Sequence, residues 1–398
     1  MNEINQIFEL HKLAIEGVKK YPERRFLFES VKNDSGPHIL GITGLRGTGK
    51  SIILKQIAAI YSDSIYISLD SIGDVDLFAV IKKLSSDYGV KTFLLDEVHF
   101  FKNIDAVLKK IYDFLDVKII FTSSVALGMF HSAYDLSRRV KLIEIYPFSF
   151  REYLFFEKGE ELSSLTIEDI RNKRYNSNHL KNEYAFEEYL KGGNLPFSIE
   201  EPDFLPLLRN ILLTVINQDI PRIAKLAVDE LDLIYKMVEF IGKSEVDGIN
   251  YSSIAKNIGI TKYKAQSYLD LLEKCFILHK ILPAGTNVLK EPKILLAPPF
   301  RLLFKEYDEC IGALREDFIV EMLAASGIQY NYLKTTRGAK TPDFLIDDGG
   351  VRYIIEVGGK GKGREQFKGI KENKQIIFTH SSRFDTIRRP LFLAGFLS

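Results

Sequence analysis

The chain has 398 residues, of which 46% are hydrophobic and 27% are charged, a balance typical of a globular protein with ample core. Its 54 lysines and arginines against 53 aspartates and glutamates give a formal net charge of +1. This neutral balance excludes one extended basic surface, so any contact with nucleic acid must come from a local patch. At about 100–200 residues per domain, we expect two to four domains.

The sequence carries no sign of a membrane or secreted protein, and we expect a cytoplasmic one. No apolar run approaches the roughly 18 residues that a membrane-spanning helix needs. Residues 1–17 carry charges throughout, unlike a signal peptide. Two cysteines, Cys275 and Cys310, are too few for a disulfide framework or a Cys-rich zinc site, which suits a reducing compartment.

The first part of the chain predicts an α/β fold. Residues 1–34 form an N-terminal segment in which residues 3–20 have loosely helical apolar spacing, and a polar linker follows at 32–37. Between 35 and 150, short apolar runs alternate with helical stretches. The runs lie at residues 38–43, 64–69, 92–96, 118–123 and 141–146. Continuous apolar strands separated by helices predict a parallel sheet that is covered on both faces.

A phosphate-binding motif follows the first apolar run. The pattern G-x-x-x-x-G-K-S at residues 44–51 opens a helical stretch, the strand–loop–helix context that its chemistry requires. Glycines let backbone N–H groups approach phosphates, and the helix N-terminus adds its positive end. We expect Lys50 to reach the β- and γ-phosphates of ATP, and Ser51 to ligate Mg²⁺. The expected nucleotide contacts are Gly44, Leu45, Arg46, Gly47, Thr48, Gly49, Lys50, Ser51 and Ile52.

Two carboxylates end the third apolar run, where ligands bind in open parallel sheets. We expect Asp96 to hold the Mg²⁺, directly or through water, and Glu97 to polarise the attacking water. The next run ends in three hydroxyl residues at 122–124, of which we assign Ser123 to sensing the γ-phosphate or positioning water. The alternative is a plain strand-to-turn transition. His99 is expected to be a turn or packing residue, because no second His or Cys lies nearby in sequence.

Arg138 and Arg139 lie just before the last predicted strand of this region. One interpretation is an arginine finger, acting in cis or in trans, that supports hydrolysis. The alternative is a solvated or salt-bridged pair.

The middle of the chain predicts helices. Residues 151–235 lose the strand pattern, and residues 236–282 predict three short helices and a strand. The pattern of residues 251–269 is typical of a helix–turn–helix motif, with a turn at Gly259 and an N-cap at Thr261. The residues that could face a DNA major groove are Lys262, Lys264 and Gln266. The alternative is a winged helix that only packs domains together, its lysines being solvated.

A β-hairpin with carboxylates is predicted at residues 341–357. If Gly349-Gly350 is its two-residue loop, counting back puts Asp343 directly opposite Glu356 on one face. Cβ atoms of opposed residues lie about 5 Å apart, which suits one divalent metal ion. The helix before the hairpin offers Glu316 as a third acid.

Pro-Asp, then a spaced Glu and a Lys, resembles the PD-(D/E)xK nucleases. In those nucleases the lysine follows the glutamate by two residues, where this chain has Gly358. Lys360 has the same strand parity about 7 Å further along, and a bulge at Gly358-Gly359 could bring it back. The alternatives are a hairpin whose acids face solvent, or a nuclease fold retained as a platform.

Together these features resemble one family of AAA-type P-loop ATPases of archaea and bacteria, whose C-terminal domain has no known function. The resemblance covers about residues 20–370, and only the phosphate loop and the Asp-Glu strand are diagnostic alone. It rests on GLRGTGKS, LLDEVHF, the TSS strand end, Arg138-Arg139 with IEIYPFSFREYLFF, and segments 189–196, 216–223 and 291–299. It implies an AAA-type core (35–150), a helical lid (151–235), a winged helix (236–300) and a restriction-endonuclease-like α/β domain (301–398).

The function that fits best is Mg²⁺-dependent ATP binding and hydrolysis, coupled to C-terminal DNA-binding or nuclease-like domains. Two alternatives stay open. One is an ATP-gated DNA nuclease, and the other is a DNA-binding regulator that uses ATP and ADP as a switch without turnover. The expected partners are nucleotide, DNA and further copies of the chain in a homo-oligomer, and no membrane.

Overall fold

In the computed structural model, the chain divides into two compact units, Met1–Ile145 and Tyr146–Ser398. The structure describes residues 3–73, 75–126, 136–246, 248–285, 291–333, 341–359, 367, 374–380 and 385–397. Within these ranges, none of the helices combines the length and the apolarity that a membrane span requires.

The described residues of the first unit form a five-stranded parallel sheet with the strand order β2-β3-β4-β1-β5. The strands are β1 (Ile39–Thr43), β2 (Ser64–Ser68), β3 (Thr92–Asp96), β4 (Lys118–Ser123) and β5 (Val140–Glu144). Each begins and ends within two residues of a predicted apolar run. The prediction of an α/β fold with a parallel sheet is therefore confirmed.

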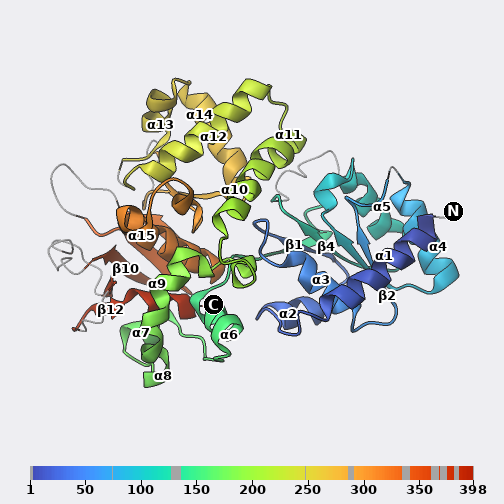
Figure 1. Ribbon diagram of the computed structural model, residues 1–398, viewed down its shortest axis with the longest axis horizontal. Helices are drawn as coiled ribbons and strands as arrows, with labels where there is room; N and C mark the ends of the chain where they lie inside the picture. Colours follow the sequence, from blue (N-terminus) through green and yellow to red (C-terminus); the bar gives the residue numbers. More distant parts are fainter. Residues whose placement is uncertain are drawn as a thin grey trace. The chain divides into compact units, whose positions relative to one another are not determined.

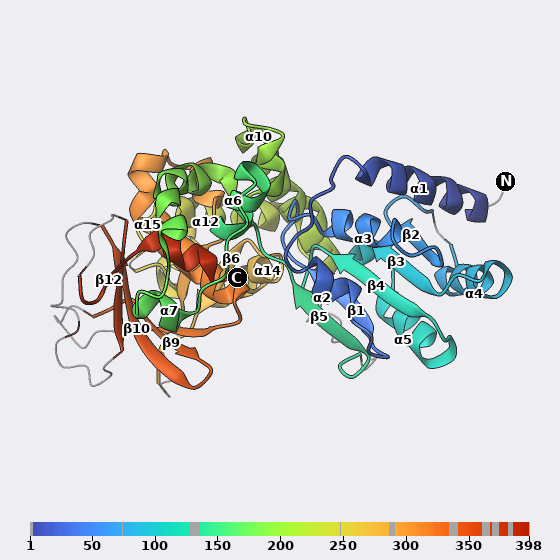
Figure 2. The same cartoon turned by 90° about the horizontal axis from the view of Figure 1, so that it is seen from below.

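Helices cover both faces of this sheet (Figures 1 and 2). Phe93 and Leu95 point to one face, where they pack with α4 (Leu77–Tyr88) and α5 (Ile104–Phe114). Leu94 points to the other, toward α2 (Phe28–Lys32) and α3 (Lys50–Ala58). Helix α1 (Glu3–Val18) packs along β2 and contributes to both clusters. Burial on both faces explains why the inner strands β1, β3 and β4 are apolar at their centres, whereas the edge strand β5 is partly exposed.

The described residues of the second unit include a five-stranded mixed sheet with the order β12-β11-β10-β9-β8. Its strands are β8 (Gln329–Tyr332), β9 (Phe344–Asp348), β10 (Val351–Gly358), β11 (Gln375–Thr379) and β12 (Arg388–Pro390). Neighbours from β8 to β10 are antiparallel, and neighbours from β10 to β12 are parallel.

The β9–β10 hairpin has the predicted turn. Gly349 and Gly350 form its two-residue loop, with left-handed φ angles of 60° and 88°. Such a loop needs φ above zero at both positions, which glycine adopts without strain. The ladder that follows has the predicted register, and its extension by one pair puts Asp343 opposite Glu356.

The first helices of the segment that was expected to form a lid, up to residue 190, belong instead to the core of the second unit. Helices α6 (Phe150–Lys158), α7 (Ile167–Arg171) and α9 (Phe186–Glu188) share one hydrophobic cluster with β9, β10, β11, α15 (Tyr307–Ala325) and a 3₁₀ segment at Leu391–Phe396. A short helix, α8 (Ser177–Leu180), lies between α7 and α9 in the chain.

The aromatic centre of that cluster shows why the predicted boundaries need correction. The rings of Phe186, Tyr189, Phe392 and Phe396 surround the fully buried Phe150 at centroid distances of 5.4, 5.4, 6.0 and 5.8 Å. Residues 150–190 thus complete the domain that was expected to begin at residue 301. Periodicity indicates that a helix has a buried face, but not which element covers it.

Between the segment 150–190 and residue 301 lies a helical region that leads into a small β-hairpin. Helix α10 (Leu205–Thr214) continues through a π-helical turn into α11 (Ile220–Ile223), and α12 (Val228–Lys243), α13 (Tyr251–Ile258) and α14 (Lys262–Lys274) follow (Figure 1). Strands β6 (Leu278–Ile281) and β7 (Lys293–Leu296) pair antiparallel. As predicted, Gly259 ends α13 with a φ of 75°, and the Thr261 side chain accepts the Lys264 N–H at the start of α14.

Candidate active site

The phosphate-loop motif lies between β1 and α3. Gly47 and Gly49 have left-handed φ angles of 83° and 90°. A Cβ atom on Gly44 would lie 2.1 Å from the carbonyl oxygen of Ile145, so only glycine fits there. A Cβ atom on Gly49 would meet no described atom within 4 Å, so open space adjoins the N-terminus of α3. This is the cradle that a phosphate group needs.

Lys50 is folded into the loop that it follows. Its side chain is 4% exposed, and its ammonium group donates to the carbonyls of Gly44 and Leu45, both at 2.8 Å. The Thr48 hydroxyl donates to the same Leu45 carbonyl at 2.8 Å. These bonds keep the loop curled around the lysine charge.

Arg25 fastens the loop from a segment that precedes the motif. Its Nη1 atom donates to the Thr48 carbonyl at 2.7 Å, and the side chain is buried. Gln56 of α3 donates to the carbonyls of Tyr21 and Glu23, at 2.9 and 2.8 Å. The sequence pattern gives no sign of Arg25, because residues 20–27 contain no recognisable motif.

Asp96 ends β3 in a buried position. Its Oδ1 atom accepts the Thr122 hydroxyl, and its Oδ2 atom accepts the Tyr66 hydroxyl at 2.5 Å. The sheet order explains this arrangement, because β2 carries Tyr66, β4 carries Thr122, and β3 lies between them. Burial and the Asp96 carboxylate raise the pKa of Tyr66, so the phenol stays a donor. Tyr66 is a site residue that the sequence did not reveal.

Glu97 follows with a left-handed φ of 54°, an uncommon conformation that marks functional sites. Its N–H donates to Thr122 Oγ1 at 3.0 Å, and its carboxylate accepts the Ser124 hydroxyl at 3.3 Å. Arg46 Nη1 and His99 Nδ1 lie 3.8 and 3.3 Å from the carboxylate oxygens. His99 lies in a 3₁₀ turn, as predicted, and it also contacts Arg46 at 3.2 Å. The phosphate loop and the candidate base are thus directly connected.

Ser123 does not reach these carboxylates. Its hydroxyl donates to the Val125 carbonyl at 2.9 Å and accepts the Val125 N–H at 3.2 Å. Thr122 and Ser124 make the carboxylate contacts instead. Alternation along a strand explains the difference, because neighbouring side chains point to opposite sides.

The two arginines before β5 differ in environment. Arg139 is buried, and its Nε and Nη2 atoms bind the two carboxylate oxygens of Asp113 at 3.0 and 3.3 Å. Arg138 is exposed. Arg138 and Arg139 precede β5 and so lie at the amino ends of the parallel strands. The phosphate loop follows the carboxyl end of β1, at the opposite edge of the sheet. Five strand residues span about 17 Å, so Arg139 is a structural ion pair and cannot act as a finger in cis.

The three C-terminal acids do not form a cluster. The described part of the chain contains no group of three or more His, Cys, Asp or Glu residues placed to hold a metal ion. Glu316 lies on α15 and pairs with Lys293 at 2.6 Å. Ile355 points toward α15, so its neighbour Glu356, with Asp343 opposite, belongs to the other face of the sheet. The alternation of strand residues thus separates Glu316 from the other two.

Two of the three predicted nucleic-acid contacts form ion pairs within the second unit. Lys262 pairs with Glu291 at 2.5 Å, and Lys264 pairs with Glu230 at 3.0 Å. Gln266 is exposed. Lys360, which was considered as the lysine of a nuclease-like motif, lies outside the described residues.

Comparison with known proteins identifies the first unit's core. Residues 36–154 match the family model of an AAA domain, and residues 186–298 match a domain of unknown function. The AAA-type core is therefore confirmed. Among solved structures, a Thermotoga maritima RuvB mutant is similar with 14% identity and a TM-score of 0.31, over 67% of this chain and 89% of that chain. AMPPCP-bound DnaA from Aquifex aeolicus has 19% identity and a TM-score of 0.25, over 66% and 88%.

Two relatives are themselves uncharacterized. A protein of Haemophilus influenzae is 25% identical, over 60% of this chain and 61% of the relative. The uncharacterized protein MJ1637 of Methanocaldococcus jannaschii is 32% identical, over 87% of this chain and 81% of the relative. At that identity and coverage, the chain belongs to the same family as MJ1637, and it carries an AAA domain.

Proposed function

We propose that the first unit binds ATP with Mg²⁺ and hydrolyses it. The supporting observation is the convergence of one lysine and two carboxylates at the carboxyl ends of neighbouring strands. Lys50 follows β1, Asp96 and Glu97 follow β3, and the polar end of β4 bonds to both acids. A chance glycine-rich turn would not bring a loop residue, Arg46, to the candidate base.

The donor set suits Mg²⁺, a hard cation that prefers oxygen ligands. Ser51 and Asp96 are the residues that would hold it. The hydrogen bonds from Tyr66 and Thr122 use only part of the lone-pair capacity of the Asp96 carboxylate, which has about four acceptor sites. When bound, the ion neutralises charge on the β- and γ-phosphates.

The chain's own residues divide the remaining work. Lys50 exchanges its two loop carbonyls for phosphate oxygens, because an ammonium group bonds more strongly to charged acceptors. Glu97 orients the attacking water and takes its proton. Ser124 donates a hydrogen bond to the Glu97 carboxylate, and His99 and Arg46 lie beside it.

Binding and turnover assays on three variants test this proposal. Lys50→Ala should abolish ATP binding or turnover, since it removes the main side-chain charge on the phosphates. Glu97→Gln should keep ATP bound and slow phosphate release by about 100-fold or more, the usual contribution of a general base. Asp96→Ala should weaken the Mg²⁺ dependence of binding. The matched control is Lys82→Ala, which removes an exposed lysine of α4. Full turnover by Lys50→Ala would refute the assignment.

Roles for the second unit rest on its element order and remain predictions. Three helices followed by a two-stranded hairpin, α12 to β7, support a winged helix, and the β8–β12 sheet with α15 supports a nuclease-like fold. Lys262 and Lys264 of α14 are about half exposed, and surface ion pairs such as theirs contribute little to stability. Our proposal includes ATP-driven action of the second unit. It excludes robust cleavage of DNA, because Gly358 stands where the PD-(D/E)xK nucleases have a lysine and the described acids form no metal-binding group. Plasmid cutting with Mg²⁺ or Mn²⁺, abolished by Asp343→Ala, would overturn that exclusion.

A further inference from the structure

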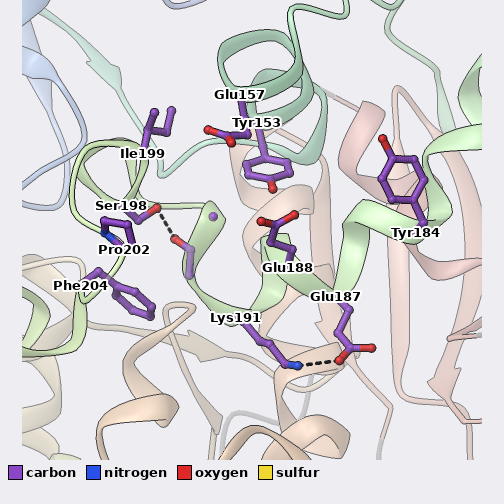
Figure 3. A pocket seen from close by; sticks show the side chains of 12 residues that line it. Tyr153, Glu157, Tyr184, Glu187, Glu188, Lys191, Ser198, Ile199, Pro202 and Phe204 are labelled. Carbon is purple, nitrogen blue, oxygen red and sulfur yellow. Dashed lines mark hydrogen bonds and ion pairs between the residues drawn. The ribbon is translucent and has the colours of Figure 1, made fainter.

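A pocket of about 550 Å³ lies in the second unit, beside the turn at Gly192 and Gly193 (Figure 3). Helix α6, the segment from Tyr184 to the glycine turn, and the loop up to Phe204 form its walls. Its volume falls within the range of small-molecule sites. None of these residues belongs to the nucleotide site.

The wall of the pocket holds a buried hydroxyl. Tyr153 is 3% exposed, and its phenol oxygen makes no hydrogen bond within 3.5 Å among the residues that the structure describes. Burial and the neighbouring Glu188 carboxylate raise the pKa of this phenol, so it stays protonated. Figure 3 shows this oxygen pointing into the pocket, toward Glu188. A Cβ atom on Gly193 would lie 2.6 Å from the Tyr153 ring, so the glycine turn packs directly on the ring and fixes it. Buried polar groups without a partner are uncommon and call for one.

The charges around this hydroxyl are mainly negative. Glu157, Glu187 and Glu188 line the pocket. Lys191 neutralises Glu187 at 2.6 Å. Lys158 is shared between Glu157 and Glu188 at 3.7 and 3.6 Å, beyond hydrogen-bond distance from both. These two carboxylates therefore keep their capacity to accept hydrogen bonds from a cation.

The opposite wall is apolar, formed by Ile199, Pro202 and Phe204 (Figure 3). A ligand that suits both walls has an aliphatic stem and a cationic end. The carboxylates and the phenol oxygen accept hydrogen bonds, the exposed ring of Tyr184 attracts a cation, and the apolar wall covers methylene groups.

We propose that this pocket binds an ammonium or guanidinium group on an aliphatic stem. Lysine and arginine side chains of a partner protein carry this chemistry, and so do free polyamines. This proposal does not depend on the proposed ATPase chemistry.

Titration calorimetry of the full chain with spermidine and, separately, with a hexalysine peptide tests the proposal. We expect saturable binding of at least one probe, and the stronger probe identifies the source. Glu157→Gln combined with Glu188→Gln should weaken binding by about tenfold or more, because charge-assisted hydrogen bonds are lost. Tyr153→Phe, which preserves ring packing, should weaken binding severalfold by removing the phenol oxygen.

The matched control is Glu239→Gln, which removes a carboxylate paired with Lys243 on α12 of the same unit. Its affinity for both probes should equal that of the natural chain. Thermal melting checks that each variant is folded. No binding of either probe would overturn the proposal, and so would equal affinity of the control, the double variant and Tyr153→Phe.

Discussion

Replacing Tyr66 by phenylalanine tests how the metal-binding carboxylate is held. The change removes one hydroxyl that donates to Asp96 at 2.5 Å, where both residues are buried. A hydrogen bond to a charged group contributes about 1.5–3 kcal/mol. Thr122 still donates to Asp96, so we expect a loss in the lower part of that range, about 1.5–2 kcal/mol. In a unit of this size, that loss lowers the melting temperature by roughly 3–8 °C.

Thermal and urea unfolding of the full chain measure this loss. Tyr88→Phe is the matched control, because Tyr88 lies in the same unit and is 52% exposed. In turnover assays, Tyr66→Phe should raise the Mg²⁺ concentration needed for half-maximal rate by about tenfold, as outer-shell changes do at metal sites. Unchanged stability together with an unchanged Mg²⁺ dependence would refute the role of Tyr66 in orienting Asp96.

Two further predictions concern arginines and pH. Arg139→Ala should destabilise the first unit by about 1.5–3 kcal/mol, because Asp113 loses its partner, whereas Arg138→Ala should leave melting unchanged and slow turnover only in assembled copies. Normal turnover of assembled Arg138→Ala would mark it as a solvated residue. Burial and the Arg315 charge lower the pKa of His380 to about 4, and Arg315 Nε donates to its Nδ1 atom at 3.2 Å. Only the unfolded chain binds a proton there between pH 6.5 and 4, so stability is lost as the pH falls through that window. Urea unfolding of His380→Gln at pH 7 and pH 5 should show a smaller loss, and an equal loss would contradict this assignment.

The strands of the first unit and the hairpin of the second could be predicted because their causes are local. A strand that is buried on both faces has a continuous apolar centre, as in Phe93–Leu95 of β3. The loop at 44–51 depends on glycine conformations that few residues adopt. Likewise, Gly349-Gly350 fixes the pairing of β9 with β10, because the turn determines the register.

The rest depends on contacts between distant positions, which no local pattern encodes. In a strand segment, Tyr66 is indistinguishable from any residue that favours strands, and only the sheet order brings it to Asp96. The partner of Arg139 on α5 is equally invisible in the sequence. Glu316 failed as a third acid for the same reason, because spacing along the chain does not reveal which face of the sheet a helix covers.

The shared core of the second unit also sets an order of events during synthesis. The sheet of the first unit is finished at Glu144, so the AAA core can fold while the ribosome is still translating the remainder. Phe150 and Phe186 emerge next, but their partners Phe392 and Phe396 are made only after α10 to β12. The nascent chain thus carries these aromatic helices without their C-terminal partners for the whole time needed to make α10 to β12. Apolar surface that is exposed during such an interval is prone to aggregation.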